Sequence, residues 1–122
     1  MNIVQVLTVI SMLESSGGKN FNHPQKNCHG WLGMSDIAIE DMAEKLGTQW
    51  NANDTLDHDK AFQMAAQYLS MYRKDDWTVI DILLFWRCGI KGMKTPSLKQ
   101  LNYAMKGLML YSDLMDGKDI TK

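Results

Sequence analysis

The residue of this sequence best suited to acid–base chemistry is Glu14. Ile3, Leu7 and Ile10 recur at helical spacing over residues 2–16, and Glu14 continues that apolar stripe. A carboxyl group at the edge of a core loses hydration, which raises its pKa. A carboxylic acid that stays protonated near neutral pH can protonate a poor leaving group such as a glycosidic oxygen. Periodicity alone also allows Glu14 to point into solvent from the last helical turn.

A second acid for such chemistry is harder to find. The other glutamates, Glu40 and Glu44, fall on a segment with the pattern of a solvent-exposed helix. Asp36 is the candidate second carboxylate, because it opens the helix that follows a long loop and would there act as general base toward water. An acid in a first helical turn is also favoured by the helix dipole alone, and Asp36 fits that role too.

Histidine and cysteine give little indication of a metal site. His23, Cys28 and His29 lie close together, but their spacing matches no common structural zinc pattern, even with His58 or Cys88 added. We therefore expect neither a metal nor another cofactor. A disulfide between Cys28 and Cys88 is an alternative use of the two cysteines, and sequence alone does not give the distance between them.

The elements that must position these residues are helices. The pattern predicts a mainly α fold, one domain over residues 1–122, of about five helices with a long loop over residues 19–33 that carries a small hairpin at most. The expected helices cover residues 2–16, 35–46, 57–73, 78–88 and 95–116.

Helix ends are marked by local residue chemistry. Ser35 and Asp57 are expected N-caps, and Thr95-Pro96 is expected to start the last helix. Glycines are expected to end four of the helices, at Gly17, Gly47, Gly89 and Gly117. The third helix should bury Phe62, Ala65, Ala66, Leu69 and Tyr72, and the last helix Leu101, Ala104, Met105, Leu108, Tyr111 and Met115.

Composition narrows the range of partners. The chain has 122 residues, 45% of them hydrophobic, and a formal net charge of −1, so we expect no nucleic-acid partner. No apolar run is long enough to span a bilayer, and we expect no membrane insertion. Residues 3–13 lack both a preceding basic residue and a cleavage pattern, so they are expected to form a helix and not a signal peptide.

Three local motifs lie in the order found in one enzyme family. Residues 10–18 (ISMLESSGG), followed by residues 20–24 (NFNHP), resemble the helix-end Glu-Ser motif of lytic transglycosylases and goose-type lysozymes, especially those of bacteriophages. Residues 30–34 (GWLGM) resemble the Gly-Leu-Met segment of that family, and residues 85–89 (FWRCG) its Ala-Tyr-Asn-x-Gly segment. The resemblance covers about residues 10–92 and implies a lysozyme-like fold with the long loop bordering a cleft.

The resemblance implies cleavage of peptidoglycan glycan strands. Glu14 would be the single general acid and base at the bond between N-acetylmuramic acid and N-acetylglucosamine, and the product would be a 1,6-anhydro sugar. A muramidase that hydrolyses the same bond is the alternative reaction. The resemblance also suggests a phage product, made in the host cytoplasm as part of the virion or as a lysis protein, acting on the cell wall and in contact with other virion proteins.

The resemblance also places the substrate-binding residues. Gly33 and Met34 would form one wall of the cleft, while Ser15 would hydrogen-bond either the Glu14 carboxyl or the loop backbone. Trp31 and Trp86 are candidates for stacking on sugar rings.

Three further side chains have candidate roles in or around the Glu14 site. Tyr68 and Tyr72 are candidates to supply a hydroxyl, though both also fit a core stripe. Arg87 stands where the family has Asn, and we expect it to stay clear of Glu14 and to bind a carboxylate of the peptide stem or the lactyl group, or the carbonyls at its helix end, because a neighbouring cation would weaken the acid.

Two hypotheses that assign the chain to other functional classes of protein remain. One is a lysozyme fold without catalysis, used for binding or structure, which the Arg87 substitution motivates. The other is a helical regulator that binds a protein partner through a methionine-rich face, since the chain contains 10 methionines.

Overall fold

A computed structural model describes residues 1–121, and within that range the chain is mainly helical, as predicted. Its helices are α1 (Ile3–Ser15), α2 (Asp36–Leu46), the 3-10 helix η1 (Ala52–Leu56), α3 (His58–Tyr72), α4 (Val79–Gly92) and α5 (Leu98–Met115). A two-stranded antiparallel hairpin, β1 (Cys28–His29) and β2 (Met34–Ser35), lies in the segment between α1 and α2. None of the helices in residues 1–121 is long and apolar enough to cross a membrane.

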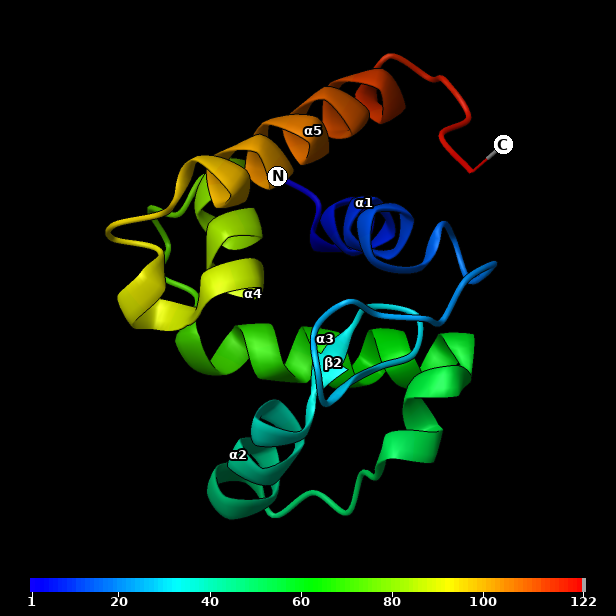
Figure 1. Cartoon of the computed structure of the whole chain (residues 1–122), viewed down its shortest axis with the longest axis vertical. Helices are drawn as coiled ribbons and strands as arrows, with labels where there is room; N and C mark the ends of the chain where they lie inside the picture. The colour runs from blue at the N-terminus through cyan, green and yellow to red at the C-terminus, as the bar shows by residue number, and fades with distance from the viewer. Residues whose placement is uncertain (122) are drawn as a thin grey trace.

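The helices are arranged around α1 and α3. In Figure 1, α5 runs across the top of the molecule, where it packs against α4 and α1, and α3 lies below α1. Helix α2 packs against α3 at the end of the molecule farthest from α5. The segment between α1 and α2 (residues 16–35, the α1–α2 loop) crosses between α1 and α3, and the hairpin contacts η1.

The apolar stripe of α1 forms the centre of the core. Val6, Leu7, Val9 and Ile10 are fully or almost fully buried, because other helices cover α1 on more than one side. A helix covered in this way ends with its last turn inside the protein. Glu14 lies in that turn.

Most helix boundaries follow the predicted caps. The side chains of Ser35, Asp57 and Thr78 each accept a hydrogen bond from a backbone N–H in the first turn of α2, α3 and α4. Gly47 ends α2 with φ 69°, a left-handed conformation that glycine adopts without strain. Gly89 was predicted to end the fourth helix, but α4 continues to Gly92 and Gly89 instead forms a kink inside it, with φ 76°.

The prediction for the start of α5 was wrong by two residues. The N-cap is Ser97, whose hydroxyl accepts from the backbone N–H of Gln100 at 3.2 Å, while the Gln100 side chain accepts from the backbone N–H of Ser97 at 2.8 Å. This reciprocal pair satisfies two backbone donors, which a cap at Thr95 followed by Pro96 does not do.

The predicted buried faces of two helices also need correction. In α5, Leu101, Met105 and Met115 are exposed, contrary to prediction, whereas Ala104 is buried as predicted and Gly107 is a buried position that was not predicted. Gly107 lies so close to Leu83 of α4 and Leu13 of α1 that an added Cβ would come within 2.6 Å of one and 3.0 Å of the other. The packed face of α5 therefore has small residues at its closest contacts, with Tyr103, Leu110, Tyr111 and Leu114 packed beside them. In α3, Met64 is buried in place of Ala66.

Candidate functional site

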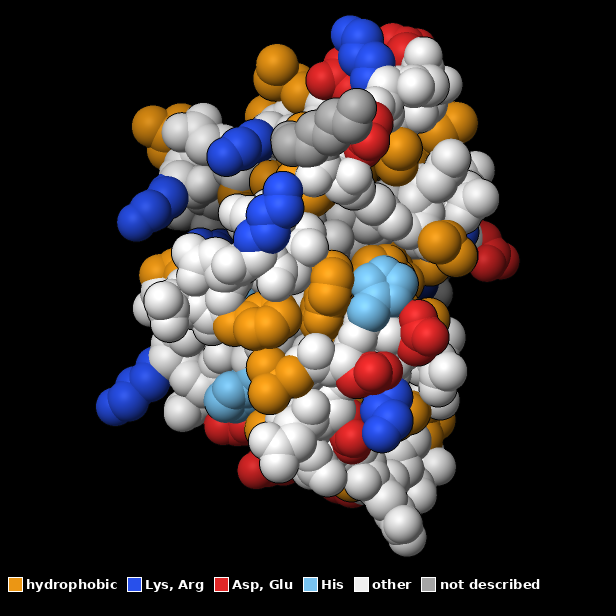
Figure 2. All heavy atoms as spheres, turned by 90° about the vertical axis from the view of Figure 1, so that its right-hand side faces the viewer, with side chains coloured by type: hydrophobic (Ala, Val, Ile, Leu, Met, Phe, Trp, Pro, Cys, Tyr) orange, Lys and Arg blue, Asp and Glu red, His pale blue; other side chains and the backbone are white. Residues whose placement is uncertain are grey.

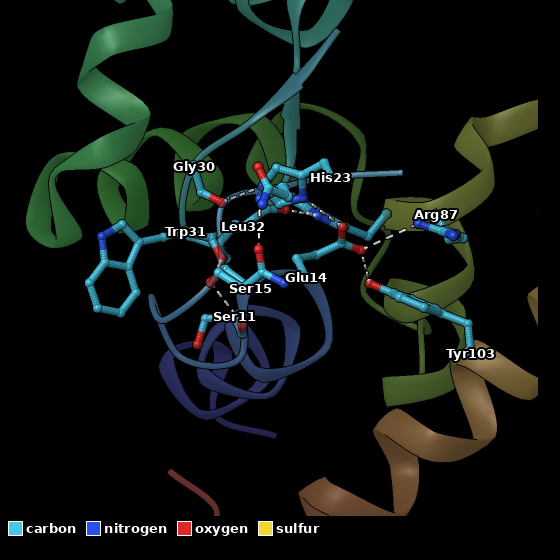
Figure 3. A network of polar contacts seen from close by, with 12 residues as sticks. Ser11, Glu14, Ser15, His23, Gly30, Trp31, Leu32, Arg87 and Tyr103 are labelled. Atoms are coloured by element: carbon cyan, nitrogen blue, oxygen red, sulfur yellow. Dashed lines mark hydrogen bonds and ion pairs between the residues drawn. The ribbon is translucent and has the colours of Figure 1, made fainter. Parts of the chain in front are cut away.

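Glu14 lies inside the protein, not in solvent. Its side chain is 6% exposed, and groups from three other parts of the chain surround its two oxygens (Figure 3). The Tyr103 hydroxyl of α5 donates to Oε2 at 2.7 Å, and the Arg87 guanidinium of α4 lies 3.7 Å from the same oxygen. His23 of the α1–α2 loop places Nδ1 3.8 Å from Oε1.

The pKa of Glu14 is raised above its ordinary value of 4.5, in the predicted direction. Burial is the largest cause, since it removes the water that stabilises a carboxylate. The Tyr103 hydrogen bond and the Arg87 cation act in the opposite direction, as does the charge of a protonated His23, and together they offset only part of the burial effect. The Glu14 carboxyl therefore keeps its proton to a higher pH than an exposed glutamate does, and groups that stabilise its charged form already surround it.

Gly33 allows the Glu14 carboxyl to lie directly against the backbone of the α1–α2 loop. A Cβ at position 33 would come within 2.4 Å of Oε1, and Gly33 also has φ 64°. Any other residue would push the carboxyl out of place. Gly33 was predicted to form part of one wall of the cleft, and its close contact in the structure is with Glu14 itself.

Ser15 fastens the loop to the end of α1. Its buried hydroxyl donates to the carbonyl of Trp31 at 2.7 Å and to that of Ser11 at 3.1 Å, and it accepts from the backbone N–H of Gly18 at 3.0 Å. Of the two predicted roles, the structure has the bond to the loop backbone. The residue that carries the acid is thus followed directly by the residue that holds the loop over it.

The 3-10 helix η1, which the sequence analysis did not predict, supports the loop from the other side. Gly30 packs against Thr55 so closely that a Cβ would lie 2.0 Å from the Thr55 carbonyl oxygen. Trp31 donates its backbone N–H to Thr55 O at 3.0 Å and its indole N–H to Leu56 O at 3.1 Å. These contacts fix the loop between α1 and α3.

Trp31 is therefore not brought to Glu14. Its ring points away from the carboxyl (Figure 3) and packs near Phe21 and His58, with centroid separations of 6.2 and 4.9 Å. Figure 2 shows the side of the molecule that carries this loop, where apolar side chains gather near the centre of the face beside a histidine. The structure gives Trp31 a packing role, and its predicted stacking on a sugar next to the acid does not fit this position.

A cavity of about 300 Å³ lies beside the site, between the hairpin and α4. Five of the predicted substrate-binding residues line this cavity: Gly33, Met34, Tyr68, Trp86 and Arg87. Glu14 does not line the cavity itself, and it meets the cavity through its contacts with Gly33 and Arg87. A second cavity of similar volume lies on the other side of Arg87 and is lined also by Gln25, Ser97, Lys99 and Gln100.

Trp86 and Tyr68 form the aromatic part of the first cavity. The Trp86 indole donates to the carbonyl of Leu32 at 2.8 Å, which ties α4 to the loop, and its ring meets Tyr68 edge-on with centroids 6.1 Å apart. Burial raises the pKa of Tyr68 to about 12, so its hydroxyl remains a neutral donor. Tyr72 instead donates to Asp41 on α2, away from Glu14.

Arg87 corrects one expectation, because it does lie beside Glu14. Its guanidinium carbon also sits 5.0 Å from the centre of the Tyr103 ring, an arrangement that holds the cation in place. The cation does lower the pKa of Glu14, as predicted for a neighbouring positive charge, but burial of the carboxyl raises this pKa by more.

The sequence analysis missed Tyr103 and did not connect His23 with the acid. A signal for Tyr103 was present, since it precedes Ala104 and lies four positions before Gly107, the two small residues on the packed face of α5. His23 lies in a loop without periodicity, where no pattern indicates which way a side chain points.

Asp36 is not brought to Glu14. It is 47% exposed at the start of α2 and accepts from His29 Nε2 at 2.8 Å. The Nε2 of His29 is therefore already paired with Asp36, and the Nε2 of His23 is paired with the carbonyl oxygen of Gly30. Within residues 1–121 no group of three or more His, Cys, Asp or Glu side chains is placed to hold a metal ion.

Cys28 and Cys88 are both free thiols, so the structure does not contain the alternative disulfide. Both line the first cavity, and burial raises the pKa of each thiol.

Comparison of the chain with known protein families, with curated proteins and with solved structures finds no match. Its function is therefore inferred from the chemistry of the site.

Proposed function

We propose that this chain is a lysozyme-like peptidoglycan-cleaving enzyme, a lytic transglycosylase that uses Glu14 as its single general acid and base. The observation that carries the proposal is the buried Glu14 carboxyl, with a raised pKa, beside a cavity of about 300 Å³. A protonated carboxyl next to space for a ligand is the requirement for protonating a glycosidic oxygen. The three local motifs supply the choice of peptidoglycan as substrate.

In the proposed reaction one proton leaves Glu14 and one returns. Glu14 donates its proton to the oxygen that bridges N-acetylmuramic acid and N-acetylglucosamine while the bond from that oxygen to the muramic C1 breaks. The N-acetyl group of the substrate stabilises the cation at C1, so no second carboxylate is needed. The Glu14 carboxylate then takes the proton of the muramic 6-hydroxyl as its oxygen bonds to C1. No water is consumed, and the acid is restored.

The neighbours of Glu14 suit this cycle. Tyr103 and Arg87 both face Oε2, where they stabilise the carboxylate that exists between the two proton transfers. Gly33, Met34 and Trp86 line the space proposed for the sugar. In the second cavity Arg87 and Lys99 are cations beside Ser97 and Gln100, which suits a carboxylate of the peptide stem.

The test is digestion of purified cell-wall sacculi by the parent chain and by Glu14→Gln. Glutamine keeps the shape of the side chain and has no proton to give, so we expect release of soluble fragments to fall by about 100- to 10,000-fold. Glu40→Gln is the matched control, because Glu40 is an exposed acid on α2 and should tolerate the change. Equal activity of Glu14→Gln and the parent would contradict the proposal.

The mass of the products separates transglycosylation from hydrolysis. Anhydro fragments are lighter by one water and lack a reducing end, whereas a muramidase would release reducing fragments. The exposed position of Asp36 and its pairing with His29 favour the reaction without a second acid. Reducing fragments that disappear in Asp36→Asn would instead assign hydrolysis.

A second candidate is a carbohydrate-binding protein without catalysis. The contact between Arg87 and Glu14 and the low exposure of the carboxyl favour this alternative. It predicts that the parent chain sediments with sacculi but releases no fragments, and that Glu14→Gln binds equally well.

A further inference from the structure

His23 is a buried histidine with one ring nitrogen unpaired. Its side chain is 1% exposed, and Nε2 lies 2.7 Å from the carbonyl oxygen of Gly30. Nδ1 is buried without a hydrogen-bond partner and faces Glu14 Oε1 at 3.8 Å (Figure 3). A buried polar atom without a partner is costly, so its position beside the acid calls for a role.

The contact with Gly30 determines which nitrogen carries the hydrogen. A carbonyl oxygen only accepts, so Nε2 must be the donor, and in the neutral ring Nδ1 is then bare. A bare nitrogen can accept from a protonated carboxyl but not from a carboxylate. The separation of 3.8 Å is about 1 Å longer than an ordinary hydrogen bond, a difference that a small rotation of the carboxyl closes.

We propose that His23 is a positioning residue of the Glu14 site, whose bare Nδ1 holds the proton on Oε1 of Glu14 between turnovers. The proposal rests on the acid role of Glu14 given above. The partners of each carboxyl oxygen would then favour a different protonation state of Glu14. Tyr103 and Arg87 favour the carboxylate at Oε2, and His23 favours the acid at Oε1.

The cycle keeps the proton count unchanged. In the resting state the Glu14 proton sits on Oε1 and points at Nδ1. When it moves to the bridging oxygen of the substrate, Nδ1 loses its donor and the carboxylate is held by the groups at Oε2. The proton taken from the 6-hydroxyl restores the bond to Nδ1, and no proton passes to His23 in the cycle.

Other groups near the pair come from each element packed against it. Arg87 of α4 is the one cation among the described groups facing Glu14, Tyr103 of α5 is a neutral donor, and Cys28 of β1 is a half-buried thiol whose pKa the Glu14 charge helps to raise. Of these groups none other than His23 offers an acceptor nitrogen to the carboxyl.

The test variant is His23→Gln. The glutamine amide nitrogen lies the same number of bonds from Cβ as Nε2, so it can still donate to Gly30 O, but it places no acceptor nitrogen toward Glu14. We expect the alkaline limb of the kcat–pH profile to move about one pH unit lower, with KM and melting temperature close to those of the parent. His29→Gln is the matched control, since His29 pairs with exposed Asp36, and its profile should stay in place. An unmoved limb in His23→Gln would overturn the proposal.

Nitrogen-15 NMR of the histidine ring tests the inference without any enzyme assay. In the parent chain at neutral pH, we expect His23 to carry hydrogen on Nε2 only, and the Nδ1 signal to shift as pH rises through the titration of Glu14. In Glu14→Gln that step should vanish. A hydrogen on Nδ1 at neutral pH, or a step that persists in Glu14→Gln, would refute the role of His23. If sacculi are not cleaved but the NMR results hold, the proposed reaction fails and the Glu14–His23 proton contact stands.

Discussion

At the scale of single residues, the site depends on opposing effects on one carboxyl group. Burial favours the protonated form of Glu14, while the Tyr103 hydroxyl and the Arg87 guanidinium favour the ionised form. An acid that must give up a proton and take one back benefits from both, because neither state is then strongly favoured over the other.

The raised pKa of Glu14 makes stability depend on pH. The folded protein binds the Glu14 proton more tightly than the unfolded chain does, so this contribution is complete below about pH 4.5 and is lost as pH rises through the folded-state pKa. The glutamine of Glu14→Gln cannot ionise, so the variant should not lose stability through this titration. We expect the unfolding free energy of Glu14→Gln, measured by urea denaturation, to improve relative to the parent between pH 4.5 and 8. A constant difference across that range would contradict the raised pKa.

Gly33→Ala separates backbone strain from displacement of the acid. Alanine at φ 64° costs about 1–2 kcal/mol by itself, and its Cβ would also collide with Glu14 Oε1. Gly47→Ala is the matched control, because Gly47 has φ 69° with nothing within 4 Å of an added Cβ. We expect both variants to lose about that much stability in denaturant titrations, and Gly33→Ala alone to lose at least about tenfold in sacculus digestion. Equal activity of the two variants would show that the Gly33 contact does not position the acid.

At the scale of elements, the sequence was most informative where structure depends on neighbours in the chain. Caps at Ser35, Asp57 and Thr78 involve residues within three positions, so local residue types were enough to place α2, α3 and α4. The predicted start of α5 was Thr95-Pro96, whereas the structure has its N-cap at Ser97, and the sequence signal for Ser97 is Gln100, three positions later.

Alanine substitutions at those two positions test which cap is used. Ser97→Ala removes the acceptor for the Gln100 N–H and should destabilise the protein by about 1 kcal/mol. Thr95→Ala should change the unfolding free energy by less than about 0.5 kcal/mol, since Thr95 is exposed outside the helix. Thermal unfolding measures both, and the reverse order would place the cap at Thr95.

The site itself was predictable only in part, because some of its contacts join residues that lie far apart in the sequence. Glu14 continues a periodic stripe and could be found from the sequence, as could the residues next to it in the chain. The partner of its Oε2, Tyr103, lies 89 positions away and meets it only because α5 packs across α1. Close packing at Gly107 helps to set the orientation of α5, and the large apolar residues alone predicted a face that is only partly right, with Ala104 and Tyr111 inward but Leu101, Met105 and Met115 exposed.

At the scale of the whole molecule, the packing of α5 links stability to the site. Gly107 lets α5 approach α1 and α4, and that approach brings Tyr103 to Glu14. The opposite face of α5 exposes Leu98, Leu101, Met105 and Met109. The two faces should therefore differ sharply in their tolerance of substitution.

Gly107→Ala and Met109→Ala compare the two faces of α5 on one helix. The added methyl at position 107 meets Leu83 and Leu13 in the core, and we expect a net loss of about 1–2 kcal/mol even though alanine favours the helix. Met109→Ala should change stability by less than about 0.5 kcal/mol. Digestion of sacculi should fall only in Gly107→Ala, because Tyr103 moves with the helix. A stabilised, fully active Gly107→Ala would contradict the close packing.

The distance in sequence between Glu14 and Tyr103 also bears on how the protein is made. Glu14 leaves the ribosome early, whereas Tyr103 is added when most of the chain has already been synthesised. Until the final helix emerges and docks, the carboxyl lacks its hydroxyl partner and part of its cover. In the proposed reaction, Glu14 would therefore have its complete set of neighbours only after α5 has docked.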